Sequence, residues 1–176
     1  KRIHDLIQAY QALPTNTMKL VIVGKERVGD KDYRAELNQS SANNPNSISV
    51  RAAYGNTLVE WYSNARAYIL PSQMEGLPIT LLEAMSFGRC CIASDIEANQ
   101  EALASKGLLY PVGKIEPLTN HLQFAIQYPE LAERQGAVLQ QHALKNYTWA
   151  FVAEEFLRFY KKSQQTPNAS HAILPK

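Results

Sequence analysis

Two glutamates, Glu75 and Glu83, are separated by seven residues in the stretch EGLPITLLEAM. Glu83 is the only ionisable residue in the segment 79–87, which has the composition of a substantially buried helix. A buried carboxylate needs a partner, because leaving it unpaired costs several kcal/mol or forces it to take up a proton. A ribose diol would serve, since both hydroxyls can donate to a carboxylate. An internal salt bridge, or an exposed position on a partly buried helix, is the structural alternative, and the residues alone leave both open.

The loop 72–78 follows an apolar segment, 67–71, and enters the helix at about Pro78. Gly76 allows backbone to approach a ligand closely, and the free N–H groups and dipole of a helix start favour an anion. A diphosphate could therefore bind here without a dedicated lysine, although an ordinary capped helix explains the same residues. The other loop that follows a strand, 24–30, has neither the three-glycine dinucleotide fingerprint nor the lysine pattern of a P-loop.

The elements that must position this loop alternate along the chain. Strands are predicted at 20–24, 47–50, 67–71, 90–94 and 107–110, with a further unassigned pattern at 33–39. Helices are predicted at the N-terminus around residues 3–10 and at 57–65, 79–87, 115–127, 129–144 and 149–162. This order predicts a Rossmann-like, doubly wound parallel sheet with helices on both faces, in one domain spanning 1–162 and followed by a flexible tail at 163–176. In such a sheet, ligands bind at the carboxyl ends of the strands.

Composition narrows the function further. The net charge is +2 with 45% apolar and 19% charged residues, which describes a globular domain without the field that nucleic acid binding needs. Cys90 and Cys91 are adjacent in an apolar run, so they are expected to be small core side chains in a reducing compartment. The sequence predicts no membrane span, no signal peptide and no metal site.

The stretch PSQMEGLPITLLEAMSFGRCCIASDIEANQE resembles the signature of the group 1 retaining glycosyltransferases of GT-B fold, which carry two glutamates at this spacing around an EGxP-type loop. The segments KRIHDLIQAYQAL, LVEWYSNARAYILPS and NYTWAFVAEEFLRFY are similar to the family's EKGxxxLIxAF, LxxxYxxADxFxxPS and FSWxxxAxxxxxxY motifs, in the same order. The resemblance implies that the chain is the C-terminal, nucleotide-sugar-binding domain of a GT-B fold. It also implies that its first strand and the N-terminal acceptor domain lie outside the sequence.

Family roles follow from the resemblance. Glu75 would act in catalysis by contacting the donor sugar, and Glu83 would hold the ribose hydroxyls. The amides of Gly76 and Leu77 would face sugar and diphosphate, and Lys1 would bind phosphate.

Later positions match less completely. Asn99 and Glu101 match the end of the family's SDxxxxxE segment and are predicted donor contacts, but Glu97 and Ala98 replace its usual glycine pair.

Arg51 replaces the glycine of the turn that adjoins the nucleobase in the family. Tyr54 would be a neighbour of the base there; alternatively, Tyr54 and Gly55 only shape a surface turn.

The implied function is metal-independent transfer of a hexosyl group from a nucleotide diphosphate sugar, with UDP-hexose favoured and no cofactor, to a saccharide or lipid acceptor. The isolated chain is expected to be inactive, and the protein cytoplasmic, with peripheral association at the inner face of the membrane through the N-terminal domain left open. The alternatives are a GT-B sugar-nucleotide epimerase or phosphorylase, and a non-catalytic nucleotide- or sugar-binding module. The sequence does not identify the base, sugar, acceptor, pathway or oligomeric state, nor whether the altered glycine positions reduce activity.

Overall fold

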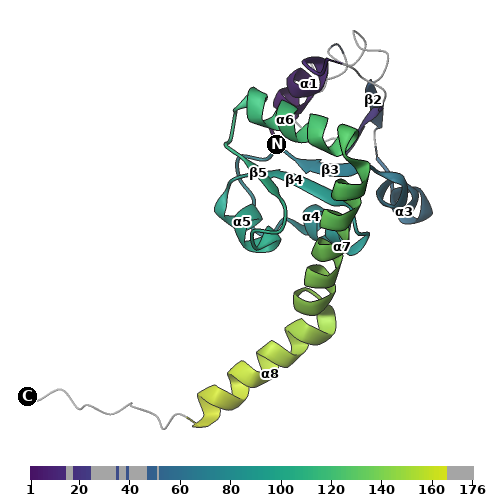
Figure 1. The fold of residues 1–176 in the computed structure, drawn as a ribbon. Coiled ribbons are helices and arrows are strands. Elements are labelled where there is room, and N and C mark those ends of the chain that lie inside the picture. The colour runs from purple at the N-terminus through teal and green to yellow at the C-terminus, as the bar shows by residue number, and fades with distance from the viewer. Residues whose placement is uncertain (15–17, 25–34, 36–38, 40–46, 51, 166–176) are drawn as a thin grey trace, which may run out of the picture.

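Helices and strands alternate along the computed structural model, which describes residues 1–14, 18–24, 35, 39, 47–50 and 52–165 (Figure 1). The strands are β1 (Leu20–Val23), β2 (Ser47–Val50), β3 (Ala67–Leu70), β4 (Cys90–Ser94) and β5 (Leu108–Tyr110). The helices are α1 (Ile3–Gln11), α3 (Gly55–Asn64), α4 (Ile79–Ser86), α5 (Glu97–Leu103), α6 (Ile115–Gln127), α7 (Pro129–Asn146) and α8 (Trp149–Gln165).

Every strand pair is parallel, as the short aliphatic runs predict. β3 pairs with β4, and β4 with β5, so β4 is the central strand of this sheet. β1 and β2 form a separate two-stranded sheet, in which Leu20 is opposite Ser47 and Val23 is opposite Val50. The predicted parallel α/β class is therefore confirmed, with its strands divided between two hydrogen-bonded sheets within the described residues.

Hydrophobic cores lie on both faces of β4, all of whose residues are buried. Cys90 and Ile92 belong to one core, with apolar side chains of α1 and α6. Cys91 and Ala93 belong to the other, with side chains of α4, α5 and α7. Successive side chains of a strand point to opposite faces, so one five-residue strand anchors both helical layers. The predicted burial of both cysteines is confirmed.

Some predicted boundaries differ from the structure. Helix α5 was not predicted, and α8 extends to Gln165 although a tail was expected from residue 163. The pattern at 33–39 lies almost wholly outside the described residues, and Arg51 and the tail from residue 166 also lie outside them.

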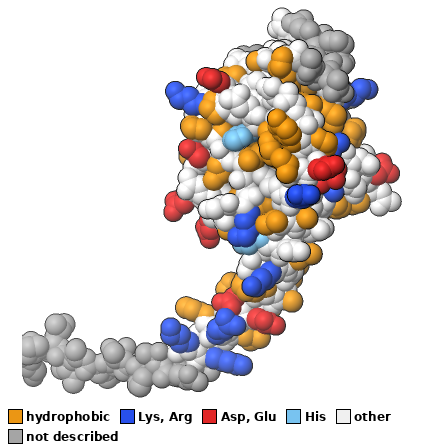
Figure 2. All heavy atoms as spheres, viewed as in Figure 1, with side chains coloured by type: hydrophobic (Ala, Val, Ile, Leu, Met, Phe, Trp, Pro, Cys, Tyr) orange, Lys and Arg blue, Asp and Glu red, His pale blue; other side chains and the backbone are white. Residues whose placement is uncertain are grey.

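Helix α8 projects away from the rest of the domain (Figure 1), and its surface carries both hydrophobic and basic side chains (Figure 2). Its large exposed apolar side chains are Trp149, Phe156, Leu157, Phe159 and Tyr160. In the part of the chain that the structure describes, no helix has the length and apolar character needed to cross a membrane.

Candidate functional site

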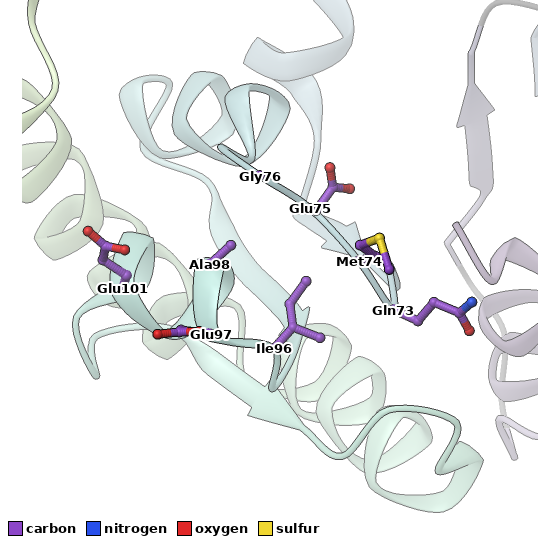
Figure 3. A pocket seen from close by; sticks show the side chains of 8 residues that line it. All are labelled: Gln73, Met74, Glu75, Gly76, Ile96, Glu97, Ala98 and Glu101. Atoms are coloured by element: carbon purple, nitrogen blue, oxygen red, sulfur yellow. The ribbon is translucent and has the colours of Figure 1, made fainter.

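A pocket of about 380 Å³ opens where β3 and β4 end. It is lined by Gln73, Met74, Glu75, Gly76, Ile96, Glu97, Ala98 and Glu101. The first four belong to the loop between β3 and α4, and the others to α5 and the residue before it, so the two segments lie side by side (Figure 3). This is the position that the rule for open parallel sheets predicts, and the volume lies in the range of small-molecule sites.

The loop between β3 and α4 presents free backbone donors. The amide N–H groups of Glu75, Gly76 and Leu77 have no acceptor among the described residues. Pro78 precedes the first residue of α4 and supplies no donor, while the amide of Ile79 bonds the Leu77 carbonyl at 2.9 Å. Unpaired amides at the positive end of a helix dipole favour an anionic ligand.

Lys1 and Glu75 form an ion pair beside these amides, through the Lys1 ammonium and Oε1 of Glu75. The side chain of Glu75 is 14% exposed and that of Lys1 is 51% exposed. Burial by itself raises the pKa of the Glu75 carboxyl, but the hydrogen bond from Lys1, the Ser72 hydroxyl and the positive charge at residue 1 together outweigh this effect and hold the pKa below its ordinary value. Glu75 is therefore ionised at neutral pH, and both of its carboxylate oxygens can act only as hydrogen-bond acceptors.

A buried cluster fixes the two pocket segments to each other. The Ser94 hydroxyl donates to the Ser72 carbonyl, and the Asn99 side-chain amide donates to the backbone carbonyl of Ser94 at 3.0 Å and to its hydroxyl at 3.1 Å. All three residues are 0% exposed. Asn99, predicted to contact the donor, thus binds the end of β4 and holds α5 against the preceding loop.

Glu83 lies on α4 and is half-buried, while Leu81, Ala84 and Met85 of the same helix are fully buried. Its Oε2 accepts a hydrogen bond of 2.9 Å from the hydroxyl of Tyr62 on α3. Sequence reasoning expected a helix buried more completely; in the structure the side facing solvent includes Ile79, which is 53% exposed. The partner of the Glu83 carboxylate inside the protein is a tyrosine hydroxyl, and no salt bridge to Glu83 is found among the described residues.

Two tyrosines line this side of α4. Burial, the neighbouring Tyr68 and the bond to Glu83 together raise the pKa of Tyr62, so its hydroxyl stays protonated and donates. Tyr68 donates to the Thr80 hydroxyl at 2.7 Å. Burial is the main reason that the pKa of Tyr68 is raised, and the charges of Glu75 and Glu83 add to it. The negative charges of both glutamates therefore disfavour ionisation of Tyr68.

The structure brings some of the predicted site residues together. Glu75, Gly76 and Glu101 line the pocket, and Lys1 reaches it through its ion pair. Leu77, at 59% exposed, is the next residue of the same loop.

The remaining positions differ in their relation to the pocket. Glu97 and Ala98, which replace the family's glycine pair, line it at the start of α5. Glu83 faces Tyr62 from the next helix and is not a lining residue. Tyr54 is 67% exposed immediately before α3 and lines no part of the pocket.

Sequence reasoning did not assign a role to Tyr62, Ser72 or Ser94. The segment quoted for the LxxxYxxADxFxxPS motif contains both Tyr62 and Ser72, so a signal was present at those positions. Their partners lie 21 and 22 residues away in sequence, and only the folded chain shows those contacts.

No group of three or more histidine, cysteine, aspartate or glutamate side chains within the described ranges is arranged to hold a metal ion. Metal independence of the reaction remains a prediction.

Parallel strands, helical layers on both faces of β4 and a pocket at the strand ends define a Rossmann-like α/β architecture. The chain belongs to the group 1 glycosyltransferases, since the family model described as Glycosyl transferases group 1 matches residues 1–141. These enzymes are transferases, and the resemblance to this family is thereby confirmed; the match includes the glutamate pair and ends before the closing motif at 146–160.

Individual relatives agree with this assignment. The chain is 25% identical over 166 residues to the O-antigen chain mannosyltransferase B of Escherichia coli, covering 92% of this chain and 42% of that protein. It is 42% identical over 82 residues to the lipopolysaccharide 1,6-galactosyltransferase of Salmonella typhimurium, covering 45% of this chain and 21% of that protein.

Solved structures share the fold. The HepE protein of Anabaena, in complex with UDP and glucose, superposes with a TM-score of 0.83 at 18% identity, over 92% of this chain and 45% of that one. Sucrose-phosphate synthase from Thermosynechococcus elongatus gives a TM-score of 0.79 at 24% identity, over 92% of this chain and 42% of that one. The chain therefore spans less than half the length of these proteins.

Proposed function

We propose that the full-length protein transfers a hexosyl group from a nucleotide diphosphate sugar, with UDP favoured, to a saccharide or lipid acceptor. The transfer retains the anomeric configuration and uses no metal ion, and the chain described here supplies the donor-binding half of the active site. The observation that carries the proposal is the juxtaposition, at the ends of two parallel strands, of a pocket, an ionised glutamate and free helix-start amides.

The charges around the pocket suggest which part of the donor binds at each wall. Glu97 and Glu101 make one wall acidic, which suits sugar hydroxyls and repels a diphosphate. The diphosphate would bind more favourably at the other wall, where the Gly76 amide and the start of α4 lie beside Lys1. On this arrangement Glu75, in the same loop as Gly76, accepts from the donor sugar, and the carboxylate of Glu83 accepts from the ribose.

The names of relatives support a sugar nucleotide donor. Two of them are an O-antigen chain mannosyltransferase and a lipopolysaccharide 1,6-galactosyltransferase, and HepE has been solved with UDP-glucose as well as with UDP and glucose. This supports UDP-hexose as the first donor to test, with a saccharide or lipid-linked saccharide as acceptor.

The proposed reaction breaks the bond between the anomeric carbon and the diphosphate oxygen and forms one between that carbon and an acceptor oxygen on the same face. The acceptor proton leaves with the departing diphosphate. The helix-start amides and Lys1 stabilise the charge that develops on the leaving group, and Glu75 fixes the sugar.

The test is a donor panel on the full-length protein. UDP-, GDP- and ADP-linked hexoses are incubated with saccharide acceptors, with and without EDTA, and the anomeric configuration of the product is read by NMR. Transfer with retention that survives EDTA is expected. Inverted product, loss of activity on chelation, or interconversion of the donor without transfer would each contradict the corresponding part of the proposal. Sugar transfer by residues 1–176 alone would contradict the assignment of this chain as half of a site.

Replacing the ribose-binding carboxylate provides a direct test. Glu83→Ala should weaken nucleotide affinity by roughly tenfold or more, because hydrogen bonds to a charged group contribute about 1.5–3 kcal/mol. Glu154→Ala, which removes an exposed carboxylate from α8, is the matched control and should leave affinity unchanged. Unaltered affinity of a folded Glu83→Ala protein, measured by titration calorimetry, would refute the role of Glu83.

A further inference from the structure

The carboxylate of Glu83 is held at one oxygen only. Its Oε2 accepts from the Tyr62 hydroxyl at 2.9 Å, whereas Oε1 has no donor among the described residues. The second contact of that hydroxyl, with the Thr80 carbonyl, is longer at 3.3 Å, so the single O–H proton is assigned to Glu83. One oxygen of the carboxylate is thus fixed, and the remaining acceptor sites are open to a ligand.

Tyr62 is a rigid donor. It is 8% exposed, and its ring stacks on that of Phe87 at 5.3 Å with an interplanar angle of 15°. A second ring, that of Tyr68, packs at 5.9 Å on a tilted plane. A tyrosine confined between two rings keeps its hydroxyl in one place, whereas a free glutamate side chain samples many rotamers and loses that freedom when it binds a ligand.

We propose that Tyr62 is a positioning residue, which orients the carboxylate of Glu83 so that its open oxygen meets the ribose hydroxyls of the donor. The inference rests on the proposed function, because it assumes that Glu83 binds the ribose. Tyr62 itself contacts no substrate; it removes the conformational cost that Glu83 would otherwise meet on binding, and this raises the affinity for nucleotides that carry the hydroxyls.

The experiment compares a nucleotide with its 2′,3′-dideoxy form, which lacks the hydroxyls. UDP and dideoxy-UDP are titrated into the full-length protein, with the GDP and ADP pairs in parallel, and the pair that binds most tightly is used. The ratio of the two affinities measures ribose recognition alone. Wild type should prefer the ribonucleotide by roughly tenfold or more.

Tyr62→Phe keeps the ring and its stacking while removing the hydroxyl. This change should lower the affinity ratio about three- to tenfold, because it weakens binding of the ribonucleotide and leaves binding of the dideoxy nucleotide unchanged. Tyr68→Phe is the matched control, since it removes the neighbouring hydroxyl that bonds Thr80, and it should not change the ratio. Thermal melts verify that each variant is folded.

The outcomes separate the two levels of inference. If Glu83→Ala removes the preference for the ribonucleotide but Tyr62→Phe leaves that preference unchanged, the positioning role is wrong and the proposed function stands. If Tyr62→Phe weakens both nucleotides equally, the residue has only a structural role and the inference is also overturned. If Glu83→Ala itself leaves the ratio intact, the assignment of ribose binding to Glu83 has failed, and the role of Tyr62 fails with it.

Discussion

Replacing Gly136 by alanine tests how closely α7 packs on the domain. A Cβ built at Gly136 would lie 2.0 Å from the carbonyl oxygen of Gly88, 2.7 Å from its carbonyl carbon and 3.0 Å from the carbonyl carbon of Arg89. All three are backbone atoms of the turn that joins α4 to β4, so no side chain can rotate away. Helix α7 would have to move by roughly an ångström, because interiors are packed too densely to absorb the methyl group.

Two opposing effects set the size of the change. Alanine is favoured over glycine within a helix by about 1 kcal/mol. Overpacking a well-packed site costs about 1–3 kcal/mol and occasionally more, and here the obstacle is backbone. Displacement of α7 also loosens its buried contacts through Leu139 and Ala143. We therefore expect a net destabilisation of about 1–2 kcal/mol, equivalent to a fall in melting temperature of about 2–8 °C for a domain of this size.

The assay is thermal and urea unfolding of the full-length protein, followed by circular dichroism. Gly24→Ala is the control, since a Cβ there would meet no atom within 4 Å, and its stability should change by less than about 0.5 kcal/mol. A Gly136→Ala protein as stable as wild type, or more stable by the helix propensity of alanine, would refute the close contact between α7 and the Gly88 turn.

Two further predictions concern ionisable groups. Because Lys1 lowers the pKa of Glu75, the pair stabilises the fold above the ordinary value of 4.5 and the effect is lost as pH falls through the folded pKa. Lys1→Met should therefore cost less than about 1 kcal/mol near neutral pH, given the exposure of the pair, and nothing in strong acid; urea midpoints that differ equally at both pH values would contradict this. Burial raises the pKa of Cys90 to about 12 and that of Cys91 as well, so iodoacetamide at mildly alkaline pH should label neither thiol until urea unfolds the chain, as checked by mass spectrometry. Rapid labelling of the native protein would show that the cysteines are not in the core.

The alternating order of strands and helices could be predicted because each element has a clear hydrophobic pattern. The run Cys90–Ser94 is apolar enough to identify a strand buried on both faces. Topology limited the candidate ligand site to the loops that follow strands, and the family motif then singled out the loop after β3. Helix α5 was missed because it has only seven residues and one of its three buried side chains, that of Asn99, is polar, so the apolar pattern is too short to identify a helix.

The candidate site was predictable to a smaller extent. Glu75 and Gly76 follow from loop chemistry and from the family motif, and the structure places both at the pocket. The contact between Glu83 and Tyr62 joins two helices through tertiary packing, which no local pattern specifies. Asn99 matches a family position, yet the angle at which α5 enters the domain buries it completely.

Helix α3 packs on the domain mainly through Tyr62, its only buried residue among those described. The partly buried Leu58 and a hydrogen bond from the Arg89 guanidinium to the Ser63 carbonyl add to this attachment. Any local opening of α3 would withdraw the Tyr62 hydroxyl from Glu83. On the proposed role of Tyr62, such an opening would leave the carboxylate free, and apparent nucleotide affinity would scale with the closed fraction. By linkage, a bound donor would stabilise α3 on the domain, so a helix that lines no part of the pocket would respond to its occupancy.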